Sequence, residues 1–112
     1  MQMEITLLDR IARVRLRGRL DTPGVDLIET KFTDEVVPDG LPTVVDLSQV
    51  NFIASMGLRM FISIGKALKR KNARMVLFAP QSQVNEVFQT VQLRDILPIV
   101  MDEAEAVRYA AG

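Results

Sequence analysis

The chain has 112 residues, 48% of them hydrophobic and 25% charged, and its fourteen basic residues balance fourteen acidic ones. This length and composition predict one globular domain, and the neutral balance favours neither a nucleic acid nor an anionic membrane as a partner. The absence of cysteine and histidine excludes disulfide scaffolds, thiol nucleophiles, serine–histidine–aspartate triads and nearly all zinc sites.

No hydrophobic run approaches the roughly 20 residues that a membrane-spanning helix needs. The N-terminus also lacks the basic start and solid apolar stretch of a signal segment. We therefore expect a cytoplasmic protein without membrane insertion. We also expect no cofactor or metal, and no enzymatic activity.

Two strands are predicted near the N-terminus. Residues 3–8 place Met3, Ile5 and Leu7 on one face. Residues 12–20 alternate more strictly, with arginine at positions 13, 15, 17 and 19, which is the period-two pattern of a half-buried strand. We interpret the arginine row as a solvated outer face, because no aromatic residues interleave with it for base stacking. An acidic groove on a partner is the alternative.

A helix is predicted to follow these strands. Thr22 is placed as its N-cap, with Pro23 at the first helical position. The helix should end before Pro38, which begins a turn. Its predicted buried face consists of Val25, Ile28, Phe32 and Val36.

The next predicted element is a central strand, Thr43–Leu47. It is apolar without alternation, which favours burial on both faces. A short polar loop is expected after it, and then a helix from Ser55 to about Lys71 that Asn72 terminates. The predicted core side of this helix contains Leu58, Phe61, Ile62, Gly65 and Leu68.

The C-terminal part repeats the alternation of strand and helix. We predict a strand at 74–79, a helix at 82–90 with Val84, Val87, Phe88 and Val91 inward, and a strand at 99–101. Asp102 is predicted to cap the last helix, with Glu105 in the capping-box position. The order β-β-α-β-α-β-α-β-α predicts an α/β fold with one mixed or parallel sheet of about four to five strands and about four helices.

Ser55 is the most informative candidate site. A hydroxyl at a helix start lies over unpaired backbone N–H groups and the positive end of the helix dipole, a position that tolerates phosphate. The serine has two possible roles from this position. It is either a phosphate acceptor or an N-cap worth about 1 kcal/mol over alanine.

Three segments, in order and in these elements, resemble STAS domains, the fold of bacterial anti-sigma factor antagonists. The resemblance extends over nearly the whole chain, which we expect to be a single STAS domain at 1–112. The segments are Gly18-Arg19-Leu20-Asp21, Val45-Asp46-Leu47-Ser48 and Phe52-Ile53-Ala54-Ser55-Met56-Gly57-Leu58.

The resemblance implies a phosphorylation switch. In that family a partner of the GHKL type, both anti-sigma factor and serine kinase, phosphorylates the serine at the Ser55 position. The unphosphorylated antagonist binds that partner and frees the sigma factor, and a serine phosphatase restores the active form. We expect the chain to act as a monomer or weak dimer.

The resemblance also implies a partner-binding surface around Ser55. Asp21 and Asp46 are expected to lie near Ser55, where each either meets the partner or caps a loop. Gly57 allows close approach of a partner backbone or close packing within the domain. Met56 and Met60 are expected to pack against the partner or to fill the core. The full predicted surface consists of Asp21, Thr22, Asp46, Ser48, Asn51, Ser55, Met56, Gly57, Arg59 and Met60.

Two other functions remain open. Phosphorylated family members often carry aspartate before the serine and a second hydroxyl residue after it, where this chain has Ala54 and Met56. That difference favours an unphosphorylated STAS subunit that binds constitutively within a transport or signalling assembly. The second alternative is an enzyme or ligand carrier that works through Asp21 and Asp46.

Overall fold

A hairpin at the N-terminus opens the sheet. β1 (Gln2–Leu8) runs antiparallel to β2 (Ile11–Leu20). The two residues between them, Asp9 and Arg10, have φ angles of 54° and 66°. A positive φ at both central positions is typical of the type I′ turn, whose twist matches that of paired strands.

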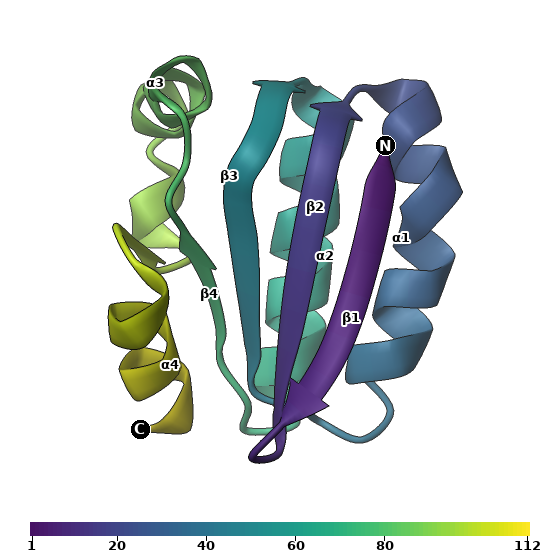
Figure 1. Cartoon of the computed structure of the whole chain (residues 1–112), viewed down its shortest axis with the longest axis vertical. Coiled ribbons are helices and arrows are strands. Elements are labelled where there is room, and N and C mark those ends of the chain that lie inside the picture. The colour runs from purple at the N-terminus through teal and green to yellow at the C-terminus, as the bar shows by residue number, and fades with distance from the viewer.

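The rest of the chain adds three strands parallel to β2, and the sheet order is β1-β2-β3-β4-β5. The computed structural model describes residues 1–112, and its element order confirms the predicted one (Figure 1). The remaining elements are β3 (Thr43–Ile53), β4 (Met75–Phe78), β5 (Ile99–Val100), α1 (Thr22–Val36), α2 (Ser55–Arg70), α3 (Ser82–Thr90), α4 (Glu103–Ala111) and a 3₁₀ turn, η1 (Leu93–Asp95).

The two faces of the sheet are covered unequally. On one face α1 and α2 lie side by side and close the main core of 24 buried residues (Figure 1). On the other face α4 covers a smaller cluster of six buried residues over β3 and β4. β3 contributes to both clusters through Val45 and Val44, which confirms the prediction of burial on both faces.

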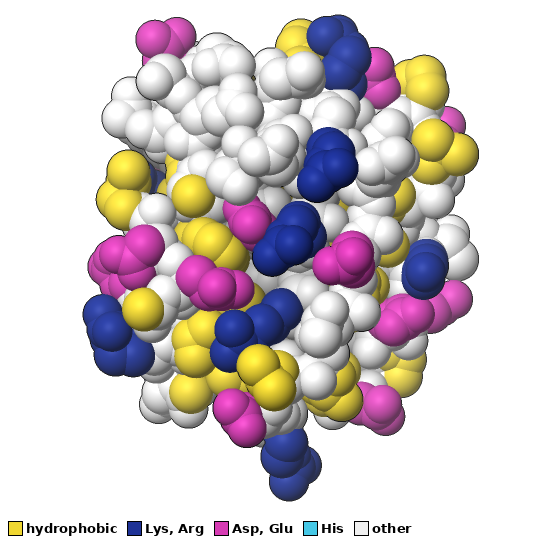
Figure 2. All heavy atoms as spheres, viewed as in Figure 1, with side chains coloured by type: hydrophobic (Ala, Val, Ile, Leu, Met, Phe, Trp, Pro, Cys, Tyr) yellow, Lys and Arg dark blue, Asp and Glu magenta, His cyan; other side chains and the backbone are white.

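The part of the second face that α4 leaves uncovered carries the arginine row of β2. In Figure 2, basic side chains run down the middle of this face with acidic side chains on either side. Arg15, Arg17 and Arg19 are exposed, whereas Arg13 is half-buried beside α4. The prediction of a mostly solvated outer face is confirmed.

Of the three helix-end residues predicted at Thr22, Asn72 and Asp102, the structure confirms the last two. Asn72 has a φ of 62° just after α2, and the backbone N–H of Ala73 donates to the carbonyl of Leu68, which is a Schellman ending. Asp102 caps α4 by accepting from the N–H of Glu105. The cap predicted at Thr22 is wrong: Asp21 is the N-cap of α1, and Thr22 is the first helical residue.

The largest difference concerns β3, which extends to Ile53 instead of ending at Leu47. Register shifts between Arg15 and Arg17 and between Gly18 and Arg19 accommodate extra residues of β3 opposite β2. The polar segment that we predicted as a loop is therefore bulged strand. Two smaller predictions were also wrong: Val91 is exposed instead of inward, and the last strand, β5, ends at Val100 instead of Met101.

Candidate functional site

Two helix starts lie next to each other at one edge of the sheet. β2 and β3 are parallel and adjacent, so their carboxyl ends meet at the same edge, at the top of Figure 1. The backbone N–H of Ala54 donates to the carbonyl of Leu20 at 3.0 Å, which ties the start of α2 to the end of β2. The topology therefore brings Asp21 and Ser55 to one end of the molecule, as predicted.

Both helices approach the strands closely through a glycine at their third position. A Cβ on Gly24 would overlap the carbonyl oxygen of Arg19. A Cβ on Gly57 would lie 2.9 Å from Cγ1 of Ile53 and 3.2 Å from the carbonyl oxygen of Leu20. Because Gly57 is itself buried, the structure favours internal packing for this residue, and the expected contact with a partner is wrong.

Ser55 is exposed and is the first residue of α2. The N-cap of α2 is Ala54, and no side chain caps this helix end. The alternative role of Ser55 as an N-cap is therefore wrong. An exposed hydroxyl beside uncapped N–H groups and the positive helix end is well placed to carry a phosphate.

Asp21 caps the neighbouring helix with its own carboxylate. Oδ1 accepts from the N–H of Gly24 at 2.8 Å, and Oδ2 accepts from Nε of Arg19 at 3.3 Å. The Gly24 N–H, and to a smaller extent Arg19, hold the pKa of Asp21 below its usual range, while desolvation acts in the opposite direction. The side chain is thus ionised at neutral pH, and its capping role is confirmed; contact with a partner stays a proposal.

An exposed aromatic residue near this edge was missed from the sequence. The guanidinium of Arg19 lies 4.1 Å from the centre of the Phe52 ring, and Arg19 and Phe52 are partners in the pairing of β2 with β3. Phe52 is 37% exposed. The sequence predicts a loop at Phe52 and therefore gives no indication of this contact. The contact depends on the pairing of β2 with the extended β3, which places Phe52 opposite Arg19.

Asp46 lies elsewhere, and its predicted position near Ser55 is wrong. β3 continues for seven residues beyond it, roughly 20 Å at about 3.3 Å per residue. The Asp46 carboxylate accepts from the N–H of Ser48 at 2.8 Å and lies 3.6 Å from Nε of Arg15. Asp21 and Asp46 therefore share no site, which removes the support for an enzyme acting through this pair.

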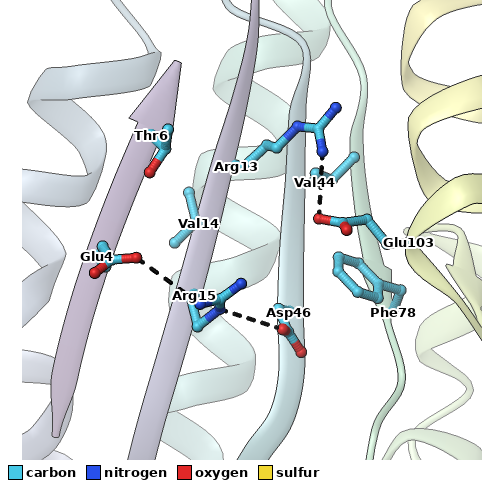
Figure 3. Close-up of a pocket in the computed structure, with 9 residues that line it drawn as sticks. All are labelled: Glu4, Thr6, Arg13, Val14, Arg15, Val44, Asp46, Phe78 and Glu103. Atoms are coloured by element: carbon cyan, nitrogen blue, oxygen red, sulfur yellow. Dashed lines mark ion pairs between the residues drawn. The ribbon is translucent and has the colours of Figure 1, made fainter. Parts of the chain in front are cut away.

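Asp46 borders a polar cavity of about 210 Å³ on the uncovered sheet face (Figure 3). Arg15 lies between Glu4 and Asp46, and Arg13 faces Glu103 of α4 at 3.5 Å (Figure 3). The charges in this cavity are thus mutually paired, which is the arrangement of a structural network more than of an open binding site.

Ser48 and Asn51 lie on the free edge of β3 beyond the end of β4. Their carbonyl oxygens accept hydrogen bonds from Nε2 of Gln81 at 2.9 Å and of Gln83 at 3.4 Å. The start of α3 therefore satisfies a strand edge that would otherwise remain unpaired. Asn51 is exposed and Ser48 is half-buried.

The predicted residues of α2 separate clearly by exposure. Arg59 is exposed one turn after Ser55, and Met56 is half-buried against the core. Met60 is fully buried, with 0% exposure, so its predicted contact with a partner is wrong and its core-filling alternative holds. Thr22 is exposed at the neighbouring helix start. The accessible residues near this edge are Asp21, Thr22, Asn51, Phe52, Ser55, Met56 and Arg59.

Two other observations concern the chain as a whole. Its acidic side chains form no group of three or more that could hold a metal ion. None of its helices combines the length and hydrophobicity required to cross a membrane.

Comparison with known proteins agrees with this geometry. The family model described as STAS domain matches residues 2–106. An anti-sigma-B factor antagonist of Listeria monocytogenes is 30% identical over 88 residues, which cover 79% of this chain and 77% of that protein.

Solved structures show the same fold. A putative anti-sigma factor antagonist of Thermotoga maritima superimposes with a TM-score of 0.91 at 21% identity, covering 98% of this chain and 95% of that one. The phosphorylated form of the Bacillus cell fate determinant SpoIIAA superimposes with a TM-score of 0.73 at 22% identity, covering 96% and 98%. The five-stranded sheet, the four helices and the match of the family model together establish that this chain belongs to the STAS domain family.

Proposed function

We propose that this protein is an anti-sigma factor antagonist that binds an anti-sigma factor with serine kinase activity in the cytoplasm and so frees a sigma factor. Phosphorylation of Ser55 ends the interaction, and a serine phosphatase restores it. The observation that carries this proposal is the exposed Ser55 hydroxyl at the uncapped start of α2. The naming of the Listeria relative as an anti-sigma-B factor antagonist supports the same role.

Physical chemistry explains how a phosphate at this position changes binding without unfolding the protein. Phosphorylation adds about 1.5 to 2 negative charges and three strong acceptors. The first N–H groups of α2 and its positive end stabilise that charge locally. Because Ser55 is exposed and no protein side chain caps this helix end, the phosphate displaces no internal cap. A partner surface fitted to a neutral hydroxyl is repelled instead.

A charge substitution tests this proposal with a control at an equivalent position. Ser55→Asp should reduce binding to the anti-sigma factor by at least about tenfold, measured by calorimetry with purified proteins. Ser82 is also exposed at the first position of a helix, α3, whose N-terminal N–H groups receive no side-chain capping bond. Ser82→Asp therefore adds the same charge in the same local setting and should leave binding unchanged.

The two variants also separate the proposed function from constitutive binding. Equal and full binding by both variants would exclude a charge switch at Ser55 and would support a constitutive STAS module in a larger assembly. Equal loss with both would indicate general charge repulsion without a role for Ser55. Circular dichroism of each variant confirms that the fold is intact.

A further inference from the structure

The charge of this neutral chain is unevenly distributed. Between Asp46 and Glu86 the sequence has no acidic residue and six basic ones, while the remainder has eight basic residues against fourteen acidic ones. All six basic residues are exposed and belong to α2 or the connection after it. They are Arg59, Lys66, Lys69, Arg70, Lys71 and Arg74.

Four of these six cations have no polar partner in the fold. The ion pairs of the structure involve only Arg13, Arg15 and Arg19, all on β2. Lys71 donates to the carbonyl of Pro38, and Arg74 donates to that of Tyr109. The remaining cations on α2 itself, Arg59, Lys66, Lys69 and Arg70, point into solvent unpaired.

Three of the unpaired cations form a stripe with Ser55. Residues 55, 59, 63, 66 and 70 are spaced by three or four positions and so share one face of the helix. All five are exposed. The stripe, defined as Ser55, Arg59, Ser63, Lys66 and Arg70, extends for about 22 Å along α2 at 1.5 Å per residue.

Helix stability does not account for the whole stripe. Lys69 and Arg70 lie in the last turn, where the helix dipole favours cations. Arg59 lies near the opposite, positive end, in a helix without any acidic residue in its first turn. Lys66 and Arg70 are like charges four positions apart, which is locally unfavourable. A function outside the helix explains these cations better.

The surroundings of the stripe favour a narrow anionic occupant. α1 packs beside α2 and carries four acidic residues against one basic residue: Asp26, Glu29, Asp34, Glu35 and Lys31. A nucleic acid duplex or a membrane would extend over this acidic neighbour, and the six excess negative charges outside the 47–85 segment would repel it. A single acidic protein segment would contact the cations alone.

We propose that the stripe is a docking surface for an acidic segment of the partner protein, and that a phosphate on Ser55 opposes this docking. The proposal deepens the proposed function and rests on it. Ser55 and Arg59 are four positions apart, so a phosphate there pairs with Arg59 and repels an acidic segment at the same time. Long-range attraction to the stripe also speeds association with the partner.

A model ligand tests the docking surface directly. The probe is a fluorescein-labelled peptide of about 16 residues, the length of α2, with glutamate and alanine in alternating pairs. Binding is measured by fluorescence anisotropy at low and at physiological salt. Lys66→Glu combined with Arg70→Glu should weaken binding by about tenfold or more. The matched control combines Arg17→Glu with Lys31→Glu, two exposed cations without ion pairs elsewhere, and should change it less than about twofold.

Amide NMR shifts on adding the peptide should map to α2. An equal effect of the two double variants, or no binding of the peptide to the wild-type protein, would overturn the proposal. Two further probes are a single-stranded DNA oligomer of equal charge and vesicles containing phosphatidylserine. Tighter binding of either one through the same cations would assign the stripe to a polyanion or a membrane and overturn the choice of a protein segment.

The same assay separates failure of this inference from failure of the proposed function. Ser55→Asp should weaken peptide binding severalfold, and Ser82→Asp should not. Peptide binding that depends on Lys66 and Arg70 but not on residue 55 would keep the docking surface and overturn its regulation by phosphate. Loss of binding to the anti-sigma factor in Ser55→Asp, with no effect of the stripe variant, would keep the switch and overturn the docking surface.

Discussion

The starts of α1 and α2 lie next to each other at one edge of the sheet and are built alike. Each follows a parallel strand, and each has a glycine at its third position against the end of β2. They differ at the N-cap, where Asp21 closes α1 with a carboxylate and Ala54 leaves α2 without a side-chain cap. The same architecture thus gives one helix end that carries its own negative charge and one that can accept it from a phosphate.

The largest effect should come from the shared glycines. Gly24→Ala places a methyl group onto the carbonyl oxygen of Arg19 and should destabilise the protein by about 3 kcal/mol or more. Gly57→Ala places a methyl group 2.9 Å from Cγ1 of Ile53 and 3.2 Å from the carbonyl oxygen of Leu20. This overlap is smaller than the one at Gly24, and a gain in helix propensity of about 1 kcal/mol offsets part of the strain. Urea denaturation of both variants measures the difference. An equal decrease in the free energy of unfolding for both variants would show that the two helix starts are packed equally tightly, which would contradict the difference described here.

A smaller effect should follow from giving α2 the cap that α1 has. Ala54 has extended backbone geometry, with φ −115° and ψ 179°, which is the geometry of an N-cap. Ala54→Asp should therefore stabilise the protein by about 1 kcal/mol, seen as a rise in melting temperature of roughly 4 °C. Ala54→Asn separates the hydrogen bond from the charge. A lower melting temperature in both variants would show that this helix end does not accept a cap.

The smallest expected effect is the pH dependence that Asp21 contributes. Because its pKa is lowered in the folded state, the unfolded chain binds more protons near that pKa, and acid favours unfolding. The stabilisation is complete above the unfolded pKa of about 4 and is lost as the pH falls through the folded value. The difference in melting temperature between the wild-type protein and Asp21→Asn should be constant from pH 7 to about pH 5 and should shrink as the pH falls below about 4. A difference that stays constant down to the lowest pH at which the protein remains folded would exclude Asp21 as the titrating group.

The sequence predicted the order of elements well because each helix has a clear apolar face and clear end signals. Val25, Ile28, Phe32 and Val36 are all buried as predicted. Capping was less certain, because Asp21 and Thr22 are neighbouring residues that both suit an N-cap. The carboxylate of Asp21 accepts a hydrogen bond from the N–H of Gly24. The helix therefore begins at Thr22, one residue earlier than predicted.

The site was predicted in part. Ser55 and Asp21 were placed at one edge by topology, and that edge is confirmed. Asp46 was misplaced because Ser48, Gln49 and Asn51 suggested a loop, whereas β-bulges keep this polar segment within β3. Met60 was misplaced because the buried face of α2 is wider than a simple stripe and includes it together with Gly57 and Ile64. Only tertiary packing reveals either feature.

Phosphosite mapping by mass spectrometry on the protein isolated from its own cells, with phosphatase inhibitors present, tests the role of Ser55 most directly. We predict a phosphate on Ser55 whose occupancy changes with growth and stress conditions, and none on Ser82, which has a similar exposed position at the start of α3. An unmodified Ser55 under every condition would contradict the switch and would indicate a constitutive binding module.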